Sequence, residues 1–304
     1  MAALLVLLFK NVLRFKRCYI LCYLICIGVF ILYFSSFEKN KSVSIHAKSP
    51  HTLCLIVPFR DRFEELREFI PHMSKFLNDQ FVNFHINIIN QVDRFRFNRG
   101  SLINAGFQLV LKKYPECDYM AMHDVDLLPL NKEISYAYPD NVAYHVSSPE
   151  LHPRYHYSKF IGGILLMSNW QFERVNGLSN KYWGWGLEDD EFYIRLKEKS
   201  IEIKRPKLVT SNSTNTFRHI HGPARKRDFQ RCFNQRNESR IRDRKTGLHD
   251  VNYVLSSLQL LTIDEFPFSL FNVTLKCDRK FTPWCTCPGK KPQINRKNVH
   301  VARV

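Results

Sequence analysis

Apolar and polar residues alternate along the middle of the chain in a way that predicts strands separated by helices. Residues 53–57 form a continuous apolar run, as expected for a strand buried on both faces, and residues 85–89 and 119–123 are further strand candidates. Apolar side chains recur at helical spacing in the intervening segments, from Leu66 to Leu77 and from Leu102 to Val110. This alternation predicts an α/β fold with a mainly parallel sheet covered by helices.

The pattern changes after Ser200, where helical spacing weakens and short strand candidates such as 270–275 become more frequent. No internal repeat is visible, and the length of residues 51–288 fits a single domain. Ligands of such sheets bind beyond the carboxyl ends of strands. Residues 58–62 and 124–126 directly follow two predicted strands, so we expect both segments to face a ligand.

The N-terminal region predicts a membrane anchor. Residues 18–37 contain no charged residue, and their length is sufficient to cross a bilayer as a helix. Basic residues precede this run, which favours a cytosolic tail at 1–17 and a luminal remainder. A cleaved signal peptide is less favoured, because the run is long and no small-residue cleavage site ends it. Residues 38–50 then read as a polar stem.

Further features agree with a luminal location. Asn-x-Ser/Thr glycosylation triplets occur at Asn40, Asn212, Asn237 and Asn272. An oxidising lumen permits disulfides; besides the cysteines at 54 and 117, the candidates are the last four cysteines: Cys232, Cys277, Cys285 and Cys287. Among these the favoured pair is Cys277 with Cys285, and a zinc site at 277, 285 and 287 is the alternative.

The formal net charge of +17 favours negatively charged binding partners. Basic residues concentrate in the N-terminal tail, in the segment Arg218–Arg244, and in the C-terminal tail 289–304, which we interpret as a solvated basic tail. Basic surfaces attract polyanions. In a lumen these would be nucleotide-sugar phosphates, acidic proteoglycan chains or membrane surfaces, and nucleic acid is not an expected partner.

The segment 183–191, Trp-Gly-Trp-Gly-Leu-Glu-Asp-Asp-Glu, combines flexible backbone, flat rings and carboxylates. Gly184 and Gly186 allow a close approach to a ligand, and tryptophan rings stack on sugars. The carboxylates offer a general base. The alternative is a helix start, because acidic residues in a first turn suit the helix dipole.

Two pairs of residues suggest a metal site. Asp124 and Asp126 directly follow a predicted strand and are separated by one residue. An extended chain would place both carboxylates on one side. His219 and His221 are also two residues apart, so both imidazoles could reach one ion. Oxygen and imidazole ligands together suit Mn²⁺. The alternative for the histidines is an ordinary polar contact.

Arginines occur near the predicted strand ends and at the start of the second helix. Arg60 and Arg62 follow the first strand, and Arg99 precedes the second helix. A guanidinium group suits bidentate recognition of a phosphate. An internal salt bridge is the competing interpretation, most of all for Arg62.

Ordered blocks of sequence resemble the β-1,4-galactosyltransferases. The blocks are Pro58–Arg62, Phe97–Gly100, Asp124–Asp126, Phe160–Gly163 and Trp183–Asp190. Within the family, the run Tyr155–Tyr157, the block Phe217–His221 and the ending Cys277–Thr286 are most similar to the branch that acts on xylose. The resemblance implies a GT-A type fold, a Rossmann-like mixed sheet flanked by helices, in a Golgi type II membrane enzyme. It implies transfer of galactose from UDP-galactose to the 4-hydroxyl of β-xylose on a proteoglycan core protein, with Mn²⁺ as cofactor.

The same resemblance implies site residues. The metal ligands would be Asp126, His219 and His221, with His221 replacing the methionine that lactose-type relatives carry at the position of Thr216. The donor contacts would be Pro58, Phe59, Arg60, Arg62, Phe97, Arg99, Asp124, Val125, Asp126 and Trp185. The acceptor contacts would be Tyr155, Tyr157, Trp183, Gly186, Glu188 and Asp189.

The implied chemistry is an inverting single displacement in which Asp189 is the base and Glu188 assists. A departing UDP needs no protein acid, so one catalytic carboxylate suffices, unlike the pair of a glycosidase. Gly184 and Gly186 fit a loop that closes over the donor.

One departure from the family pattern concerns the donor sugar. Galactose-selective relatives carry Tyr where this chain has Phe160, which keeps the bulk but loses the hydroxyl. A β-1,4-galactosyl- or N-acetylgalactosaminyltransferase acting on N-acetylglucosamine-terminated glycans is therefore the alternative function. A metal-dependent glycosidase or phosphodiesterase, and a silent sugar-binding protein, are the other classes.

Overall fold

The computed structural model describes residues 26–30, 49–222 and 225–288 of the chain. The chain forms two units, residues 1–47 and residues 48–304. In the first unit, residues 26–30 are helical, and the rest of the predicted anchor 18–37, the tail 1–17 and most of the stem lie outside the described residues. None of the helices in the described part has the length and apolar character needed to cross a bilayer. The predicted C-terminal tail 289–304 also lies outside the described residues.

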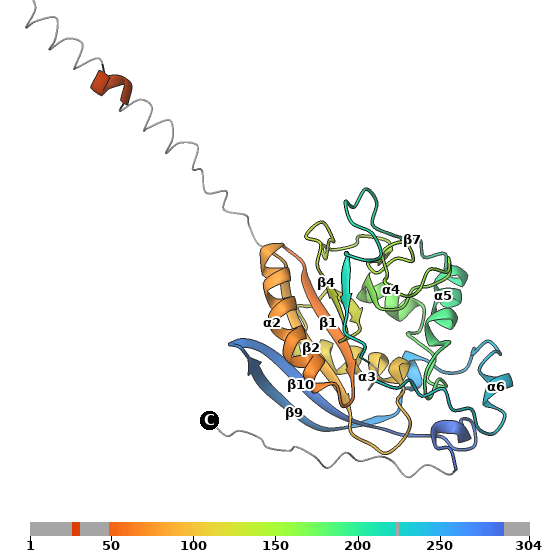
Figure 1. Cartoon of the computed structure of the whole chain (residues 1–304). Coiled ribbons are helices and arrows are strands. Elements are labelled where there is room, and N and C mark those ends of the chain that lie inside the picture. The colour runs from red at the N-terminus through yellow and green to blue at the C-terminus, as the bar shows by residue number, and fades with distance from the viewer. Residues whose placement is uncertain (1–25, 31–48, 223–224, 289–304) are drawn as a thin grey trace, which may run out of the picture. The chain divides into compact units, whose positions relative to one another are not determined.

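The second unit is built on an eight-stranded mixed sheet with the order β7-β5-β6-β3-β1-β2-β10-β9 (Figure 1). The strands are β1 (Thr52–Phe59), β2 (Asn83–Gln91), β3 (Tyr119–His123), β5 (Ala143–His145), β6 (Ile164–Ser168), β7 (Ile203–Lys204), β9 (Tyr253–Ile263) and β10 (Phe266–Leu275). A separate antiparallel pair is formed by β4 (Leu127–Pro129) and β8 (Phe217–His219). The helices are α2 (Phe63–Asp79), α3 (Arg99–Lys113), α4 (Asn169–Arg174), α5 (Glu188–Glu198) and α6 (Gln235–Glu238), with short 3₁₀ helices η1 (Leu248–Asp250) and η2 (Pro283–Cys285).

The strands and helices predicted between residues 53 and 123 are confirmed. The predicted parallel arrangement holds for the centre of the sheet, where β1 pairs in parallel with β2 and β3, and β2 pairs with β10. The antiparallel strands β6 and β9 flank this centre, which makes the sheet mixed. The strand predicted at 270–275 is confirmed but is longer than expected, because it is part of β10, which forms a hairpin of 10- and 11-residue strands with β9. The strands β7 and β8 are short, as predicted after residue 200.

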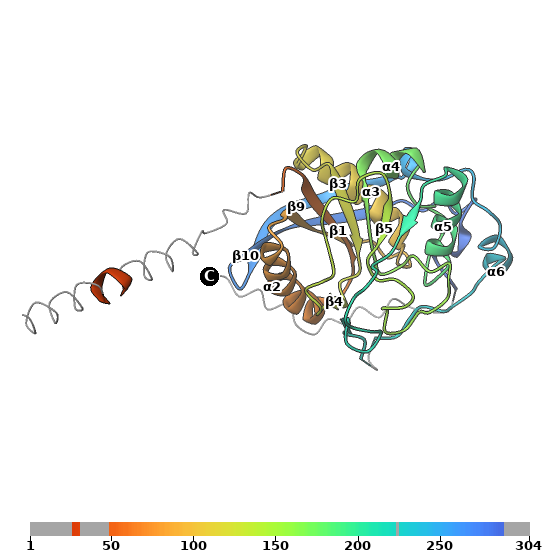
Figure 2. The ribbon, with the colours of Figure 1, turned by 90° about the horizontal axis from the view of Figure 1, so that it is seen from above.

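The continuous apolar run in β1 is explained by its central position. Alternate side chains such as Leu55 and Val57 pack on the face covered by α2, whereas Cys54 and Ile56 pack on the face covered by α3 (Figure 2). Gly106 allows α3 to lie close to the sheet, since a Cβ there would be 2.7 Å from the Ile89 side chain. Burying a Leu or Val side chain contributes about 1.5–3 kcal/mol, so these two faces supply much of the domain's stability.

Disulfides join distant parts of the domain. The predicted Cys277–Cys285 pair is confirmed, and the other two candidates form Cys232–Cys287. The zinc alternative is wrong because these sulfurs are bonded to one another. Cys54–Cys117, which links β1 to the segment before β3, was not predicted, since a cysteine in a buried apolar run resembles an ordinary core residue.

The topology brings three loops to one edge of the sheet. β1 and β3 are parallel, so residues 58–62 and 124–126 follow strands that end on the same side. β6 runs antiparallel to β3 with Ile164 opposite His123, and therefore Gly162 and Gly163 lie beside the end of β3. The Asp124 amide donates to the Gly163 carbonyl at 3.0 Å, which fixes the two loops together.

Candidate active site

A cavity of about 840 Å³ opens at this edge of the sheet. Its lining residues come from the segments 58–62, 97–99, 124–127, 152–163, 184–190 and 219–240. Small-ligand sites commonly measure about 300–1,000 Å³, so the cavity is large enough for a nucleotide sugar together with part of a second substrate.

Asp126, His219 and His221 form a group whose ligand atoms all lie within 4.8 Å of one another. His219 Nε2 is 3.6 Å and His221 Nδ1 is 3.4 Å from the same carboxylate oxygen of Asp126. Ligands held about 2 Å from one ion are themselves roughly 3–4 Å apart, so this arrangement fits a single cation. Leu127 pairs with His219 in the β4–β8 ladder, which brings the two ligand segments together.

The protonation of this group also fits a metal. Burial lowers the pKa of His221, which favours the neutral imidazole that binds metals. Burial would raise the pKa of Asp126, but its contacts with His219 and His221 outweigh burial and lower it. One carboxylate oxygen and two imidazole nitrogens are a donor set suited to Mn²⁺.

The extended conformation predicted for Asp124 and Asp126 is wrong, although both residues line the cavity. The segment is a turn, closed by a hydrogen bond of 3.3 Å from the Leu127 amide to the Asp124 carbonyl, and not an extended strand. The two carboxylates have different partners: Asp126 lies with the histidines, while Asp124 accepts from Arg99 Nε at 2.8 Å.

The acidic half of the segment 183–191 begins helix α5. Leu187 precedes the helix with a φ of 77°, and Glu188 to Glu191 occupy the first turn, as the helix-start hypothesis predicted. Burial raises the pKa of Asp189 to about 8, with further contributions from Glu188 and Asp190, while Arg99 opposes the shift. Asp189 is half-buried and lines the cavity. A carboxylate with this pKa is suited to act as a general base near neutral pH.

Glu188 is the second unusual carboxylate. Burial raises its pKa, and its Oε2 atom is buried with no hydrogen-bond partner among the described residues. A buried acceptor without a partner is costly, and here it faces a substrate-sized cavity. Glu188 is therefore placed to accept a hydrogen bond from a ligand.

The absence of a side chain at Gly162 leaves room for the Asp189 carboxylate. A Cβ at this position would lie 2.7 Å from Asp189 Oδ2 and 2.7 Å from the Phe160 ring. The Gly162 carbonyl accepts from His145 Nε2 at 2.9 Å and from Ser147 Oγ at 2.8 Å, which fixes the backbone. The absent side chain thus leaves the space that the carboxylate occupies.

An aromatic wall of Tyr155, Tyr157 and Phe160 lies next to Asp189. The ring centroids of both tyrosines lie 5.0–5.6 Å from that of Phe160. The Tyr155 hydroxyl is buried without a partner among the described residues, so it is free to bond a ligand. His152 completes this wall, with burial lowering its pKa to about 3. Sequence analysis missed His152, because a single histidine carries no motif.

The two tryptophans of the segment 183–191 differ in environment. Trp185 is 40 % exposed and lines the cavity, between Gly184 and Gly186 with φ values of 86° and 99°. Trp183 is only 3 % exposed; it packs edge-on against Phe95 with centroids 5.7 Å apart. The prediction that Trp183 contacts the acceptor is not met by its side chain, which belongs to the core and not to the cavity wall.

The predicted donor residues mostly line the cavity, with one correction. The lining residues include Pro58, Arg60, Arg62, Phe97, Arg99, Asp124, Val125, Asp126 and Trp185. Phe59 is the exception, because the alternation of β1 directs its ring into the core, where it packs edge-on against Phe63.

Each predicted donor arginine also has an internal partner. Arg60 donates to the carbonyls of residues 91, 93 and 95, Arg62 lies 3.4 Å from Glu65, and Arg99 bonds Asp124. The internal salt-bridge interpretation of these arginines is therefore confirmed, and phosphate recognition stays a prediction for three residues that also line the cavity.

Basic residues of the segment Arg218–Arg244 form another side of the cavity. The lining residues from this segment include Lys226, Arg227, Arg231, Arg236 and Arg240. Their charge run was noted in the sequence, but no spacing distinguished these positions from a solvated face.

Comparisons with known proteins agree with this geometry. A family model described as the N-terminal region of glycosyl transferase group 7 matches residues 40–139, and one described as the N-terminal domain of galactosyltransferase matches residues 142–221. β-1,4-Galactosyltransferase 7 of Drosophila melanogaster is 51 % identical over 254 residues, covering 83 % of this chain and 78 % of the relative. Xylosylprotein 4-β-galactosyltransferase of Caenorhabditis elegans is 53 % identical over 241 residues, covering 78 % of this chain and 83 % of the relative.

Comparison with solved structures supports the same family. The catalytic domain of Drosophila β-1,4-galactosyltransferase 7 in complex with xylobiose superposes with a TM-score of 0.76 at 51 % identity, covering 78 % of this chain and 99 % of that chain. A mutant of the same enzyme in complex with manganese, UDP-Gal and xylobiose gives the same values. The domain has the GT-A type glycosyltransferase fold, and the chain belongs to the β-1,4-galactosyltransferase family.

Proposed function

We propose that this protein transfers galactose from UDP-galactose to the 4-hydroxyl of β-xylose on proteoglycan core proteins. The observation that carries the proposal is one cavity that is lined both by the Asp126–His219–His221 group and by the half-buried carboxylate of Asp189. The Drosophila relative, half identical to this chain, has been crystallised with manganese, UDP-Gal and xylobiose, which supports the same donor, metal and acceptor class here.

Mn²⁺ is the metal that we assign to Asp126, His219 and His221. When bound there, it would offset the negative charge that develops on UDP as the sugar leaves. The donor contacts that the cavity supports are Pro58, Arg60, Arg62, Phe97, Arg99, Asp124, Val125 and Trp185. We call the segments 58–62, 97–99 and 124–126 the donor edge.

The opposite side of the cavity is assigned to xylose. Tyr155, Tyr157, Gly186 and Glu188 line it together with Asp189, and we call residues 155–162 and 186–190 the acceptor edge. Asp189 takes the proton from the 4-hydroxyl as that oxygen attacks the anomeric carbon. The bond to UDP breaks on the opposite face, so the anomeric configuration inverts. Glu188 accepts a hydrogen bond from a neighbouring xylose hydroxyl and orients the ring.

The glycine–tryptophan loop excludes water from this reaction. Gly184 and Gly186 adopt positive φ values that other residues rarely reach, and Trp185 lies between them over the cavity. A closing movement of this loop would cover the donor. Exclusion of water matters because hydrolysis of UDP-galactose competes with transfer.

Phe160 bears on the choice of donor sugar. Its ring lies against Gly162 and the tyrosines of the acceptor edge, where its bulk would exclude an N-acetyl group. Galactose is therefore the favoured donor, and N-acetylgalactosamine is the competitor to be tested.

The proposal also covers the cellular location of the protein. The charge-free run 18–37 and the basic residues before it support a single-pass type II anchor in the Golgi membrane, with the catalytic domain in the lumen. The three disulfides support an oxidising compartment.

A panel of donors and acceptors tests the function. The soluble domain would be assayed with UDP-galactose or UDP-N-acetylgalactosamine, and with a β-xyloside or an N-acetylglucosaminide, each with and without Mn²⁺. We expect transfer from UDP-galactose to the xyloside only, dependent on Mn²⁺. Preferred transfer to the N-acetylglucosaminide would contradict the proposal.

A further inference from the structure

The cationic segment 225–240 runs from the donor edge to the acceptor edge of the cavity. At its start, Arg225 Nε lies 2.6 Å from Glu65 Oε1 at the beginning of α2, next to the donor edge. At its end, Gln235 Nε2 donates to the Trp183 carbonyl at 2.9 Å, and the Tyr182 hydroxyl donates to the Ser239 carbonyl at 3.2 Å. The last part of the segment therefore lies beside the chain that leads into α5 and its acidic first turn.

Basic side chains along this segment differ in their partners. Arg227 lies 5.0 Å from the centroid of the Trp185 ring, and Arg231 donates to the Trp185 carbonyl at 3.0 Å, so both belong to the glycine–tryptophan loop. Arg236 and Arg240 are exposed and line the cavity. Within the described residues, neither has a carboxylate within ion-pair distance.

The nearest acid along the chain does not neutralise them. The Glu238 carboxylate accepts from Asn234 Nδ2 at 3.1 Å and forms no ion pair within the described part of the chain. The arginines of the donor edge, in contrast, each have a partner. Arg236 and Arg240 are thus uncompensated positive charge on the acceptor side of the cavity.

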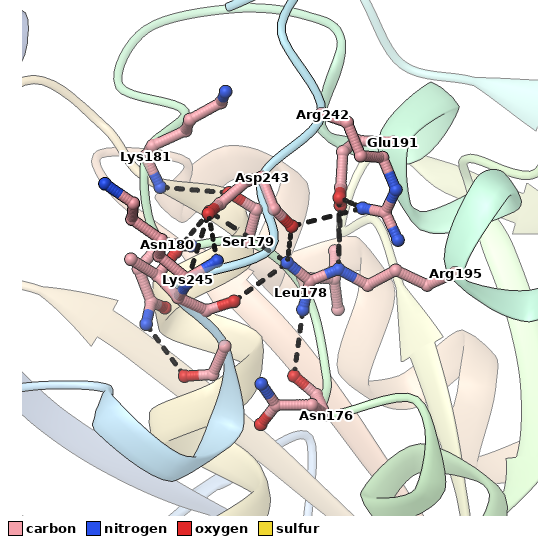
Figure 3. A network of polar contacts seen from close by, with 12 residues as sticks. Asn176, Leu178, Ser179, Asn180, Lys181, Glu191, Arg195, Arg242, Asp243 and Lys245 are labelled. Carbon is pink, nitrogen blue, oxygen red and sulfur yellow. Dashed lines mark hydrogen bonds and ion pairs between the residues drawn. The ribbon is translucent and has the colours of Figure 1, made fainter. Parts of the chain in front are cut away.

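The backbone around and after these two arginines is held by buried polar contacts, and Figure 3 shows the part of this network around Arg195 and Asp243. Lys181, only 5 % exposed, donates to the Glu238 carbonyl at 2.9 Å and to the Ile241 carbonyl. Arg195 of α5 donates to the Asp243 carbonyl at 3.1 Å and to the Thr246 carbonyl at 2.8 Å. Arg240 is thereby held between anchored residues, and Arg236 lies two residues before the first anchor, Glu238.

The positions of Arg236 and Arg240 suit binding of an anion next to the acceptor sugar, outside the reacting ring. A guanidinium group binds carboxylates with high geometric specificity. An acceptor sugar attached to a polypeptide brings that polypeptide to the mouth of the cavity on the acceptor side. We propose that Arg236 and Arg240 form a subsite for acidic side chains of the acceptor protein next to its xylosylated residue; this rests on the proposed transfer to xylosylated protein.

The expected effect is moderate, because both arginines are exposed. A partly solvated ion pair contributes about 0.2–1 kcal/mol, so two such pairs would favour an acidic acceptor by about fivefold in kcat/KM. The preference should weaken between 50 and 300 mM salt, roughly as expected for a Debye length that shrinks to below ~10 Å.

The test uses three acceptors and the soluble catalytic domain. The acceptors are a plain β-xyloside, a xylosylated peptide with Asp and Glu flanking the sugar, and the same peptide with Asn and Gln instead. Wild type should favour the acidic peptide about fivefold over the neutral one. The double variant Arg236→Ala/Arg240→Ala should lose this preference while its kcat/KM for the xyloside stays within about twofold of wild type.

Two further double variants test whether the preference depends on the position and sign of the charge. The control Arg67→Ala/Arg174→Ala removes the same charge from exposed helix positions that do not line the cavity, and it should keep the wild-type preference. Arg236→Glu/Arg240→Glu should favour a peptide whose flanking residues are Lys. Thermal unfolding of each variant checks that the fold is intact.

The outcomes separate this inference from the proposed function. If wild type shows no preference for the acidic peptide, the proposed subsite is overturned. It is also overturned if Arg236→Ala/Arg240→Ala raises the KM for UDP-galactose equally with all acceptors, because the two arginines would then bind the donor. Wild-type transfer to the xyloside tests the proposed function by itself, and its absence would overturn both.

Discussion

Arg60, Arg62 and Arg99 at the donor edge each have an internal acidic partner, whereas Glu188 and Asp189 at the acceptor edge have no cation within ion-pair distance among the described residues. The donor edge is therefore positioned by pairs that exist before any ligand binds. The acceptor edge holds buried carboxylates whose pKa values burial raises. Under the proposed function, the donor would be bound by charges that already have partners, whereas the proton would be taken by a carboxylate without an ion-pair partner among the described residues.

The largest expected effect comes from removing the uncompensated base. Asp189→Asn keeps the shape of the acceptor edge but cannot accept a proton, and general-base catalysis contributes about 10²–10⁴-fold. We expect kcat to fall about 10³-fold, while calorimetry shows unchanged binding of UDP with Mn²⁺. Turnover close to wild type would remove Asp189 from the base role.

Gly162→Ala tests whether the position of Asp189 matters in addition to its charge. The new Cβ would lie 2.7 Å from Asp189 Oδ2, and displacement of a reacting group by about 1 Å can cost 10²-fold in rate. We expect kcat to fall about 10²-fold with little change in the KM for UDP-galactose. Gly222→Ala is the matched control, because a Cβ there meets no atom of the described residues within 4 Å. Equal losses in both variants would argue against a positioning role for Gly162.

At the donor side, His219→Ala or His221→Ala removes one imidazole from the proposed metal site. We expect the Mn²⁺ concentration for half-maximal activity to rise at least about tenfold, and Mn²⁺ affinity measured without substrate to fall likewise. His249→Ala, an exposed histidine elsewhere, should leave the titration unchanged. A wild-type Mn²⁺ titration in both site variants would exclude this coordination.

The smallest effect is expected from Phe160→Tyr at the acceptor edge. The ring keeps its bulk and gains a hydroxyl, so the discrimination between UDP-galactose and UDP-N-acetylgalactosamine should change by only a few-fold, as for one partly solvated hydrogen bond. The ratio of kcat/KM values for the two donors measures this. A change greater than about 100-fold would mean that the hydroxyl, and not the bulk, selects the sugar.

The sequence was sufficient for the regular elements and the motif residues. The apolar run 53–57 and the helical spacing of Leu66–Leu77 predicted β1 and α2, because periodicity records which side chains are buried. The pairs Asp124/Asp126 and His219/His221 were visible in the sequence, and the structure brings Asp126 and both histidines together.

What the sequence could not give depends on tertiary context. Trp183 and Trp185 are two residues apart in one motif, yet packing places one in the core and the other on the cavity. Cys54 pairs across 63 residues of sequence, and no local pattern records such a contact. The exposed leucines of β9 blurred the alternation from which its length could have been predicted.

The pH dependence of kcat/KM, with UDP-galactose and xyloside both below saturation, tests the central claim most directly. Because burial raises the pKa of Asp189 to about 8, this carboxyl is largely protonated at pH 6 and becomes a competent base only as the pH rises. We predict that kcat/KM increases about tenfold per pH unit between pH 6 and 7.5 and levels off above about pH 8. A profile that is flat from pH 5.5 to 8 would show that the acceptor-edge carboxylate has an ordinary pKa, and would contradict the account.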